Sequence, residues 1–287
     1  MPQPGWLEVH VRASSIKDAL DCAMRYEAKN LLGIRMPSAG IAHLGTAIHA
    51  GAAIYDQSVI DGKPVSHDEA VGRFVDTLHL DRNPEEPTDD GVAWDEDMPR
   101  AEAEEVGTKG IINYIEDIGS KRRYKAVEAK LEKFPVSFPD QQVTIIHTGK
   151  TDRIRAVERQ VFAGGIGHGI TDIKSGKTRV SKGEKRVNVN AEKAQLAVYE
   201  LIAEKGTGIP ITAPAEIAGI STAKHASVAT IEVHGTRQAL VGTGETPGVL
   251  DFLARMLRSG TFPPNPSSHL CSRRFCPLWE NHCPYRD

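Results

Sequence analysis

The chain has 287 residues, of which 40% are hydrophobic and 25% charged, an ordinary globular composition whose length suits one large domain. The formal net charge of −3 excludes a globally basic nucleic-acid-binding protein but is compatible with a local basic surface. No segment is apolar enough to predict a membrane span, and the N-terminus lacks the basic and apolar blocks of a signal peptide. The sequence therefore predicts a cytoplasmic protein.

The N-terminal part is predicted to be mostly helical. Residues 14–32 carry apolar side chains at helical spacing and begin near a candidate capping box at residues 15–18. A second helix is expected over residues 41–60. Residues 81–105 are acidic, contain prolines and have few apolar positions, which predicts a solvated loop or inserted excursion. A further helix is expected to include residues 110–115.

The centre of the chain changes to the alternating pattern of β-strands. Strands are expected over residues 127–138, 142–147, 153–161, 170–174, 215–220 and 227–233. Helices are expected over residues 191–205 and 247–258, and the remaining tail looks irregular. A strand-rich centre framed by helices at both ends indicates an α/β core.

Cysteine use favours a metal centre over disulfides. One cysteine lies near the N-terminus and three lie near the C-terminus: Cys22, Cys271, Cys276 and Cys283. Because the number of cysteines is even, they could instead form two disulfides. A chain of this size without an export signal does not need disulfides, and a reducing compartment would not keep them. The spacing therefore predicts metal or cluster ligation, with tetrahedral Zn²⁺ as one occupant.

Acidic residues on the predicted strands suggest a divalent-metal site. Asp172 and Lys174 are two apart in one strand, so their side chains share a face. Asp152 supplies a second carboxylate at the mouth of a strand pair. Two carboxylates on adjacent strands suit Mg²⁺ or Mn²⁺. The Asp-x-Lys pattern alone is weak evidence, because a surface ion pair has the same pattern.

Two predicted helices carry further candidate residues. Gly45 and His49 are four apart in one helix, where the glycine would allow a close backbone approach and the histidine could point into the gap. The alternative is a hydrogen-bonded core or interface histidine. Gln195 and Tyr199 are also four apart, and their alternative is an ordinary partly buried polar pair.

Taken together, these residues resemble the ordered motifs of the PD-(D/E)XK nucleases, and more narrowly the RecB and CRISPR-adaptation branch. The resemblance rests on His49, Asp152, the run Asp172–Lys174, and the pair Gln195 and Tyr199, with one cysteine before the core and three after it. It covers nearly the whole chain. The gaps between the last three cysteines are wider than is usual in that branch, which leaves Zn²⁺ as the alternative to an iron–sulfur cluster.

The resemblance implies a restriction-endonuclease-like core, in which a mixed central sheet is flanked by helices. It implies a single RecB-like nuclease domain over residues 1–287. Its parts are a helical N-terminal part over 1–125, a nuclease core over 126–260 and a cluster-binding tail over 261–287. In this family the four cysteines ligate a [4Fe–4S] cluster.

The resemblance also implies a mechanism. His49, Asp152, Asp172 and the carbonyl of Ile173 would bind one or two Mg²⁺ or Mn²⁺ ions. Lys174 would orient the attacking water and stabilise the transition state. Gln195 and Tyr199 would position the strand or support Lys174. The expected activity is a metal-dependent DNA exonuclease acting in recombination, repair or end processing; the alternative is a catalytically silent DNA-binding scaffold.

Basic stretches suggest where DNA would bind. Lys182, Lys185 and Arg186 follow the Asp-x-Lys strand and are the favoured phosphate contacts, and residues 121–123 are a second candidate. A solvated charged face is the alternative for both. The expected partners are DNA, either single-stranded or with free ends, and a helicase or recombination protein. No membrane partner is expected.

Overall fold

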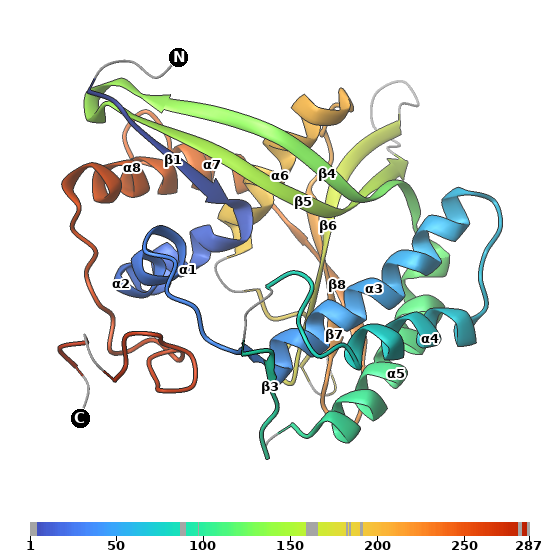
Figure 1. Cartoon of the computed structure of the whole chain (residues 1–287). Helices are drawn as coiled ribbons and strands as arrows, with labels where there is room; N and C mark the ends of the chain where they lie inside the picture. Colours follow the sequence, from blue (N-terminus) through green and yellow to red (C-terminus); the bar gives the residue numbers. More distant parts are fainter. Residues whose placement is uncertain are drawn as a thin grey trace.

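The computed structural model describes residues 5–86, 90–96, 98–158, 166–181, 183, 185–189, 192–280 and 283–285. Its centre is a six-stranded mixed sheet with helices on both faces (Figure 1). The α/β class and the mixed sheet flanked by helices, both expected from the sequence, are confirmed. Within the described part of the chain, none of the helices has the length and hydropathy that crossing a bilayer would require.

The sheet is built around the long strand β5. Its strands are β1 (Leu7–Arg12), β4 (Arg123–Phe138), β5 (Val143–Glu158), β6 (Ile166–Gly176), β7 (Ala215–Ser221) and β8 (Val228–Val233). β4 lies antiparallel along one edge of β5. The other edge pairs with parallel β1 over residues 143–148 and with antiparallel β6 over residues 153–158. Residues 149–152 of β5 therefore lie between two partner strands on that edge.

One helical layer covers one face of the sheet. It contains α3 (Gly40–Ile60), α4 (His67–Leu78) and α5 (Arg100–Asp117). Its buried side chains form one hydrophobic cluster with Ile173 and Ile220 of the sheet. This face therefore receives the side chain of Ile173, and the pleat sends Asp172 and Lys174 to the opposite face.

The opposite face is covered by α6 (Glu192–Thr207), α7 (Thr236–Val241) and α8 (Val249–Ser259). A second hydrophobic cluster joins residues of α6 and α8 to Ile154 and Ile170 of the sheet. The short helices α1 (Ile16–Asp21) and α2 (Ala23–Tyr26) lie beside the C-terminal tail (Figure 1). A separate two-stranded sheet consists of β2 (Ser38–Ala39) and β3 (Val92–Ala93).

Several sequence-based boundaries need correction. The helix expected over residues 14–32 is interrupted at Cys22, whose backbone is extended with φ −146° and ψ 101°. The proposed capping box there is wrong, because the hydroxyl of Ser15 donates to the carbonyl of Arg12 at 2.9 Å and no side chain caps α1. The strands expected over 142–147 and 153–161 are one continuous strand, β5, up to Glu158; residues 159–161 lie outside the described residues.

Candidate active site

Strand β6 presents the Asp-x-Lys pair as the sequence predicted. The ammonium of Lys174 lies 3.1 Å from Oδ1 and 2.8 Å from Oδ2 of Asp172, whose side chain is buried. Burial raises the pKa of Asp172 to about 6, with Asp152 adding to the effect and Lys174 opposing it. Burial would also lower the pKa of Lys174, but Asp172 outweighs it. The pair is therefore an internal ion pair and not the exposed surface pair that was the alternative.

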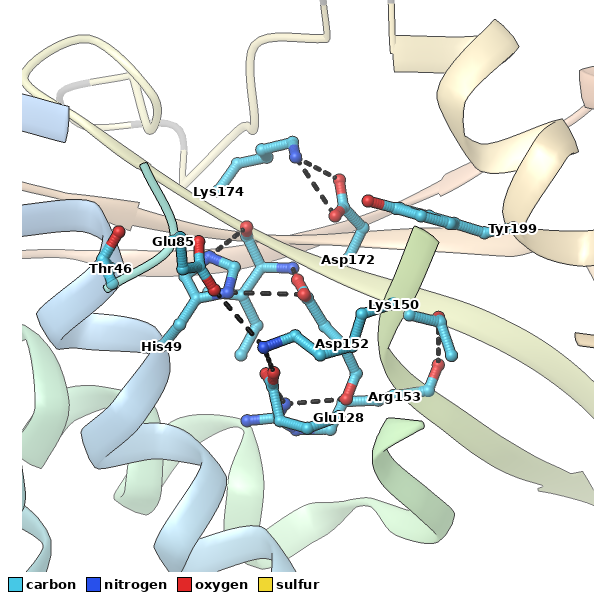
Figure 2. A network of polar contacts seen from close by, with 12 residues as sticks. Thr46, His49, Glu85, Glu128, Lys150, Asp152, Arg153, Asp172, Lys174 and Tyr199 are labelled. Atoms are coloured by element: carbon cyan, nitrogen blue, oxygen red, sulfur yellow. Dashed lines mark hydrogen bonds and ion pairs between the residues drawn. The ribbon is translucent and has the colours of Figure 1, made fainter. Parts of the chain in front are cut away.

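His49 on α3 lies against Asp152 on β5 (Figure 2). It also lies against the backbone of Ile173 on β6. The Nδ1 atom of His49 lies 3.3 Å from Oδ1 of Asp152, and its Nε2 atom lies 2.9 Å from the carbonyl oxygen of Ile173. The backbone N–H of Ile173 donates to Oδ2 of Asp152 at 2.7 Å. The three groups thus form a closed polar ring.

The charges in this ring reinforce one another. Burial would lower the pKa of His49, but the Asp152 carboxylate outweighs burial and raises that pKa to about 9. Burial would raise the pKa of Asp152, and the neighbouring His49, Lys174 and Arg153 together hold it below its usual value. A protonated His49 can donate to the carboxylate and to the Ile173 carbonyl at once. Positive charge is therefore favoured at the place where a metal ion would lie.

Glu128 on β4 joins this group, although the sequence analysis did not identify it. One ligand atom each from His49, Glu128 and Asp152 lies within 4.8 Å of the others. Glu128 has a φ of 51°, a left-handed conformation that is uncommon for a residue with a side chain. It lies between two residues of β4 that pair with Arg153 and Thr151 of β5. An alternating strand pattern carries no signal for such a backbone.

The buried side chain of Arg153 donates a hydrogen bond to Glu128. The guanidinium of Arg153 donates through Nε to Oδ2 of Asp56 at 2.5 Å and through Nη1 to Glu128 at 3.3 Å. Asp56 also accepts from the hydroxyl of Tyr114 at 2.8 Å. The side chains of Arg153 and Asp56 are fully enclosed, so neither charge is shared with solvent. The position of Glu128 is therefore tied to the helices α3 and α5.

The candidate residues Tyr199 on α6 and Gly45 on α3 both lie next to β6. Gln195 donates through Nε2 to the hydroxyl of Tyr199 at 3.0 Å, and Tyr199 lies beside Asp172 (Figure 2). Burial and the Asp172 carboxylate raise the pKa of Tyr199 well above its ordinary value, so its hydroxyl stays neutral. A Cβ added to Gly45 would lie 3.3 Å from Oγ of Ser175, which agrees with the close approach of α3 to β6 that the sequence suggested.

The donor set fits a hard divalent cation. Carboxylates with one imidazole suit Mn²⁺ or Mg²⁺. Of the ligands expected from the sequence, His49 and Asp152 lie together with Glu128. Asp172 is engaged by Lys174, and the Ile173 carbonyl lies within hydrogen-bonding distance of His49. The structure thus adds Glu128 to the candidate ligands.

The four cysteines come from both ends of the chain to one place. Cys22, Cys271, Cys276 and Cys283 line a common pocket and form no disulfide. Two contacts hold the tail on the first helices: the side-chain amide of Asn265 donates to the carbonyl of Asp21 at 2.8 Å, and the N–H of Met24 donates to Pro263 at 3.3 Å. Among the described residues, no three cysteine sulfurs lie within 4.8 Å of one another.

The basic stretches singled out in the sequence differ in their surroundings. Lys182 lies outside the described residues, whereas Lys185 and Arg186 are exposed. In the stretch at residues 121–123 each side chain has a carboxylate partner. Arg122, for example, pairs at 2.9 Å with the buried Glu216. That second stretch is therefore already neutralised within the fold.

Comparison with known proteins agrees with the fold. Residues 10–287 match the PD-(D/E)XK nuclease superfamily, and the chain belongs to that superfamily. A solved structure from Eubacterium rectale, named "Putative exonuclease", has the same fold with a TM-score of 0.50 at 14% identity. The alignment covers 91% of this chain and 86% of the other. No curated protein sequence matches the chain.

Proposed function

We propose that this protein is a metal-dependent deoxyribonuclease that acts as an exonuclease in recombination, repair or end processing. The single observation that carries the proposal is the closed group of His49, Asp152 and Ile173 beside the Asp172–Lys174 ion pair. Membership of the nuclease superfamily and the exonuclease name of the similar structure support the reaction class. DNA as the substrate and the exonuclease mode are the finer parts of the proposal.

The residues of the site divide the work between metal binding and water activation. His49, Glu128 and Asp152 would hold the cation, and Asp172 would join them when Lys174 turns toward the substrate. A bound Mg²⁺ or Mn²⁺ would lower the pKa of a water and neutralise charge on the scissile phosphate. Lys174 would orient the nucleophilic water and stabilise negative charge as it develops. The neutral hydroxyl of Tyr199, held by Gln195, would keep the Asp172 carboxylate in place.

A catalytically silent scaffold of the same fold is the competing function. Such a scaffold would not need a buried Asp172 at 1% exposure facing a lysine, nor a carboxylate at Asp152 held at 6% exposure. Even a paired buried charge is often less stabilising than apolar side chains of similar volume would be. The site retains that cost, which favours the enzyme.

An iron–sulfur cluster in the cysteine pocket is a further part of the proposal. Four cysteines line this pocket, and four thiolates are the ligand number that a [4Fe–4S] cluster takes, with tetrahedral Zn²⁺ as the alternative occupant. The extended backbone at Cys22 supports the same assignment, because it breaks the helix at the residue that must reach the tail.

The test of the proposed function is degradation of an end-labelled DNA oligonucleotide by the full-length protein. The expected result is cleavage with Mn²⁺ or Mg²⁺, none with EDTA, and recovery when the metal is restored. Progressive shortening from one end would support the exonuclease mode. DNA that binds but stays intact with every divalent metal would establish the silent scaffold instead.

A further inference from the structure

A basic hollow lies between the first helices and the C-terminal tail. Its volume is about 500 Å³. Five basic side chains line and define this hollow: Arg12, Lys17, Lys29, Arg35 and Arg274. None of them belongs to the stretches for which phosphate contacts were expected from the sequence. The hollow is therefore a second, separate concentration of positive charge in a chain whose formal net charge is −3.

Most of these basic side chains form no ion pair among the described residues, although Glu85 and Glu86 also line the hollow. Within the described part of the chain, Arg12, Lys17, Lys29 and Arg35 form no ion pair and no side-chain hydrogen bond. The carboxylate of Asp18, which also lines the hollow, is paired with Arg25 at 3.2 Å. Lys17 is attracted by Asp18, Asp172 and Glu192, so Arg12, Lys29 and Arg35 are the cations most available to an anionic ligand among the described residues.

The hollow adjoins the pocket of the proposed active site. Lys17 interacts electrostatically with both Lys174 and Asp172: burial and Lys174 lower its pKa, and Asp172 raises it. Glu85 lines the hollow and also the neighbouring pocket that contains His49 and Glu128. A chain lying in the hollow would thus reach the metal-binding carboxylates at one end.

The cysteine-rich tail forms one wall of the hollow. Its residues there are Leu270, directly before Cys271, and Arg274 and Phe275, between Cys271 and Cys276. The Arg274 guanidinium lies 5.0 Å from the centre of the Phe275 ring and forms an ion pair with Asp95. This wall offers a guanidinium plane and an aromatic ring, the groups on which unpaired bases stack.

We propose that this hollow binds single-stranded nucleic acid and leads it to the site, with Lys29 and Arg35 contacting phosphates and the Arg274–Phe275 wall contacting bases. The proposal rests on the proposed nuclease function and names the surface that receives its substrate. A positively charged groove combined with a stacking surface is the arrangement that binds single strands without regard to sequence. A duplex has no free base faces, so the wall would give it no stacking contact.

The test reverses two charges of the hollow that lie outside the metal site. The double variant Lys29→Glu/Arg35→Glu is compared with Lys63→Glu/Lys205→Glu, which makes the same change at exposed lysines elsewhere. The dissociation constant for a labelled single-stranded DNA is measured over a range of salt, with Ca²⁺ in place of Mg²⁺ to prevent cleavage. We expect at least about a tenfold weaker affinity for the first variant, with the salt slope reduced by about 1.4.

The outcomes separate the surface from the enzyme. Equal affinity and equal salt slope for the two double variants would overturn the assignment of the hollow. The proposed nuclease function would still be supported if the wild type cleaved DNA in a metal-dependent way. Failure of the wild type to bind single-stranded DNA, or equal binding of a polyglutamate chain, would also overturn the proposal. Weaker binding by the hollow variant alone would establish it.

Discussion

His49 and Asp152 lie 3.3 Å apart although they belong to a helix and a strand more than a hundred residues apart in sequence. The remaining nitrogen of His49 reaches the backbone of Ile173, directly before Lys174. This single histidine therefore joins α3 to β5, which carries Asp152, and to β6, which carries Asp172. It is charged in this arrangement, and a metal ion would take over the place of its proton.

Replacement of His49 separates a ligand from a structural histidine. If His49 binds the metal, His49→Ala should raise the Mn²⁺ concentration needed for half-maximal cleavage by about tenfold or more, because one ligand of the set is lost. The measurement is a metal titration of the cleavage rate beside a thermal melt. A lower melting temperature with an unchanged metal requirement would show a core histidine instead.

The raised pKa of His49 predicts how metal-free stability depends on pH. The folded protein holds the His49 proton up to about pH 9, whereas an unfolded histidine releases it near pH 6.5. The contribution of His49 to the free energy of unfolding is therefore complete below pH 6.5 and is lost as the pH rises toward 9. Urea unfolding of metal-free protein across this window should show the decline, and His49→Asn should show less of it. Identical pH dependence in both proteins would contradict the assignment.

Replacing only one member of the buried ion pair between Arg153 and Asp56 should lower the free energy of unfolding more than neutralising both members does. Arg153→Met leaves Asp56 without its cation and should lower the free energy of unfolding by roughly 3–5 kcal/mol. It should also weaken Mn²⁺ binding, since Glu128 loses its contact with Arg153. The control is the double variant Arg153→Met/Asp56→Asn, which should recover part of the stability. Equal stability of the single and double variants would show that the two charges are not coupled.

Cys22 tests the cluster because it is the remote member of the pocket. Protein purified without oxygen should be brown and contain about four irons per chain if the cluster is a cubane. Cys22→Ser should bleach the protein and lower its melting temperature, because the tail loses its anchor. Ser14→Ala, at an exposed nearby position, should leave both unchanged. Zinc at one ion per chain without iron would contradict the cluster and leave the nuclease untouched.

Much of the site followed from periodicity and spacing. The two-residue repeat of a strand is enough to place Asp172 and Lys174 on one face, and the helical repeat is enough to pair Gln195 with Tyr199. Glu128 could not be found in this way, because its role depends on one left-handed backbone angle and on strand register. The partner of Arg153 is likewise set by tertiary packing.

Two missed elements did carry a signal. Strand β1 alternates apolar and polar residues from Leu7 to Val11, and it lies in the sheet beside β5. Helix α4 begins with a capping box in which the hydroxyl of Ser66 accepts from the N–H of Glu69 at 3.2 Å, and the carboxylate of Glu69 accepts in return. Both elements were missed because their sequence patterns are short and lie next to loops. The helical N-terminal part expected from the sequence therefore also supplies one strand of the central sheet.

The central claim is that the Asp172–Lys174 pair acts on a phosphodiester bond and does not merely stabilise the fold. The most direct measurement is the product pattern of end-labelled single-stranded DNA with Mn²⁺ for the wild type, Lys174→Ala and the charge-balanced double variant Asp172→Asn/Lys174→Gln. We predict that both variants lose cleavage by at least about a hundredfold. The double variant should keep the wild-type melting temperature and DNA affinity, since it leaves no unpaired buried charge. Near-wild-type cleavage by the folded double variant would contradict the account.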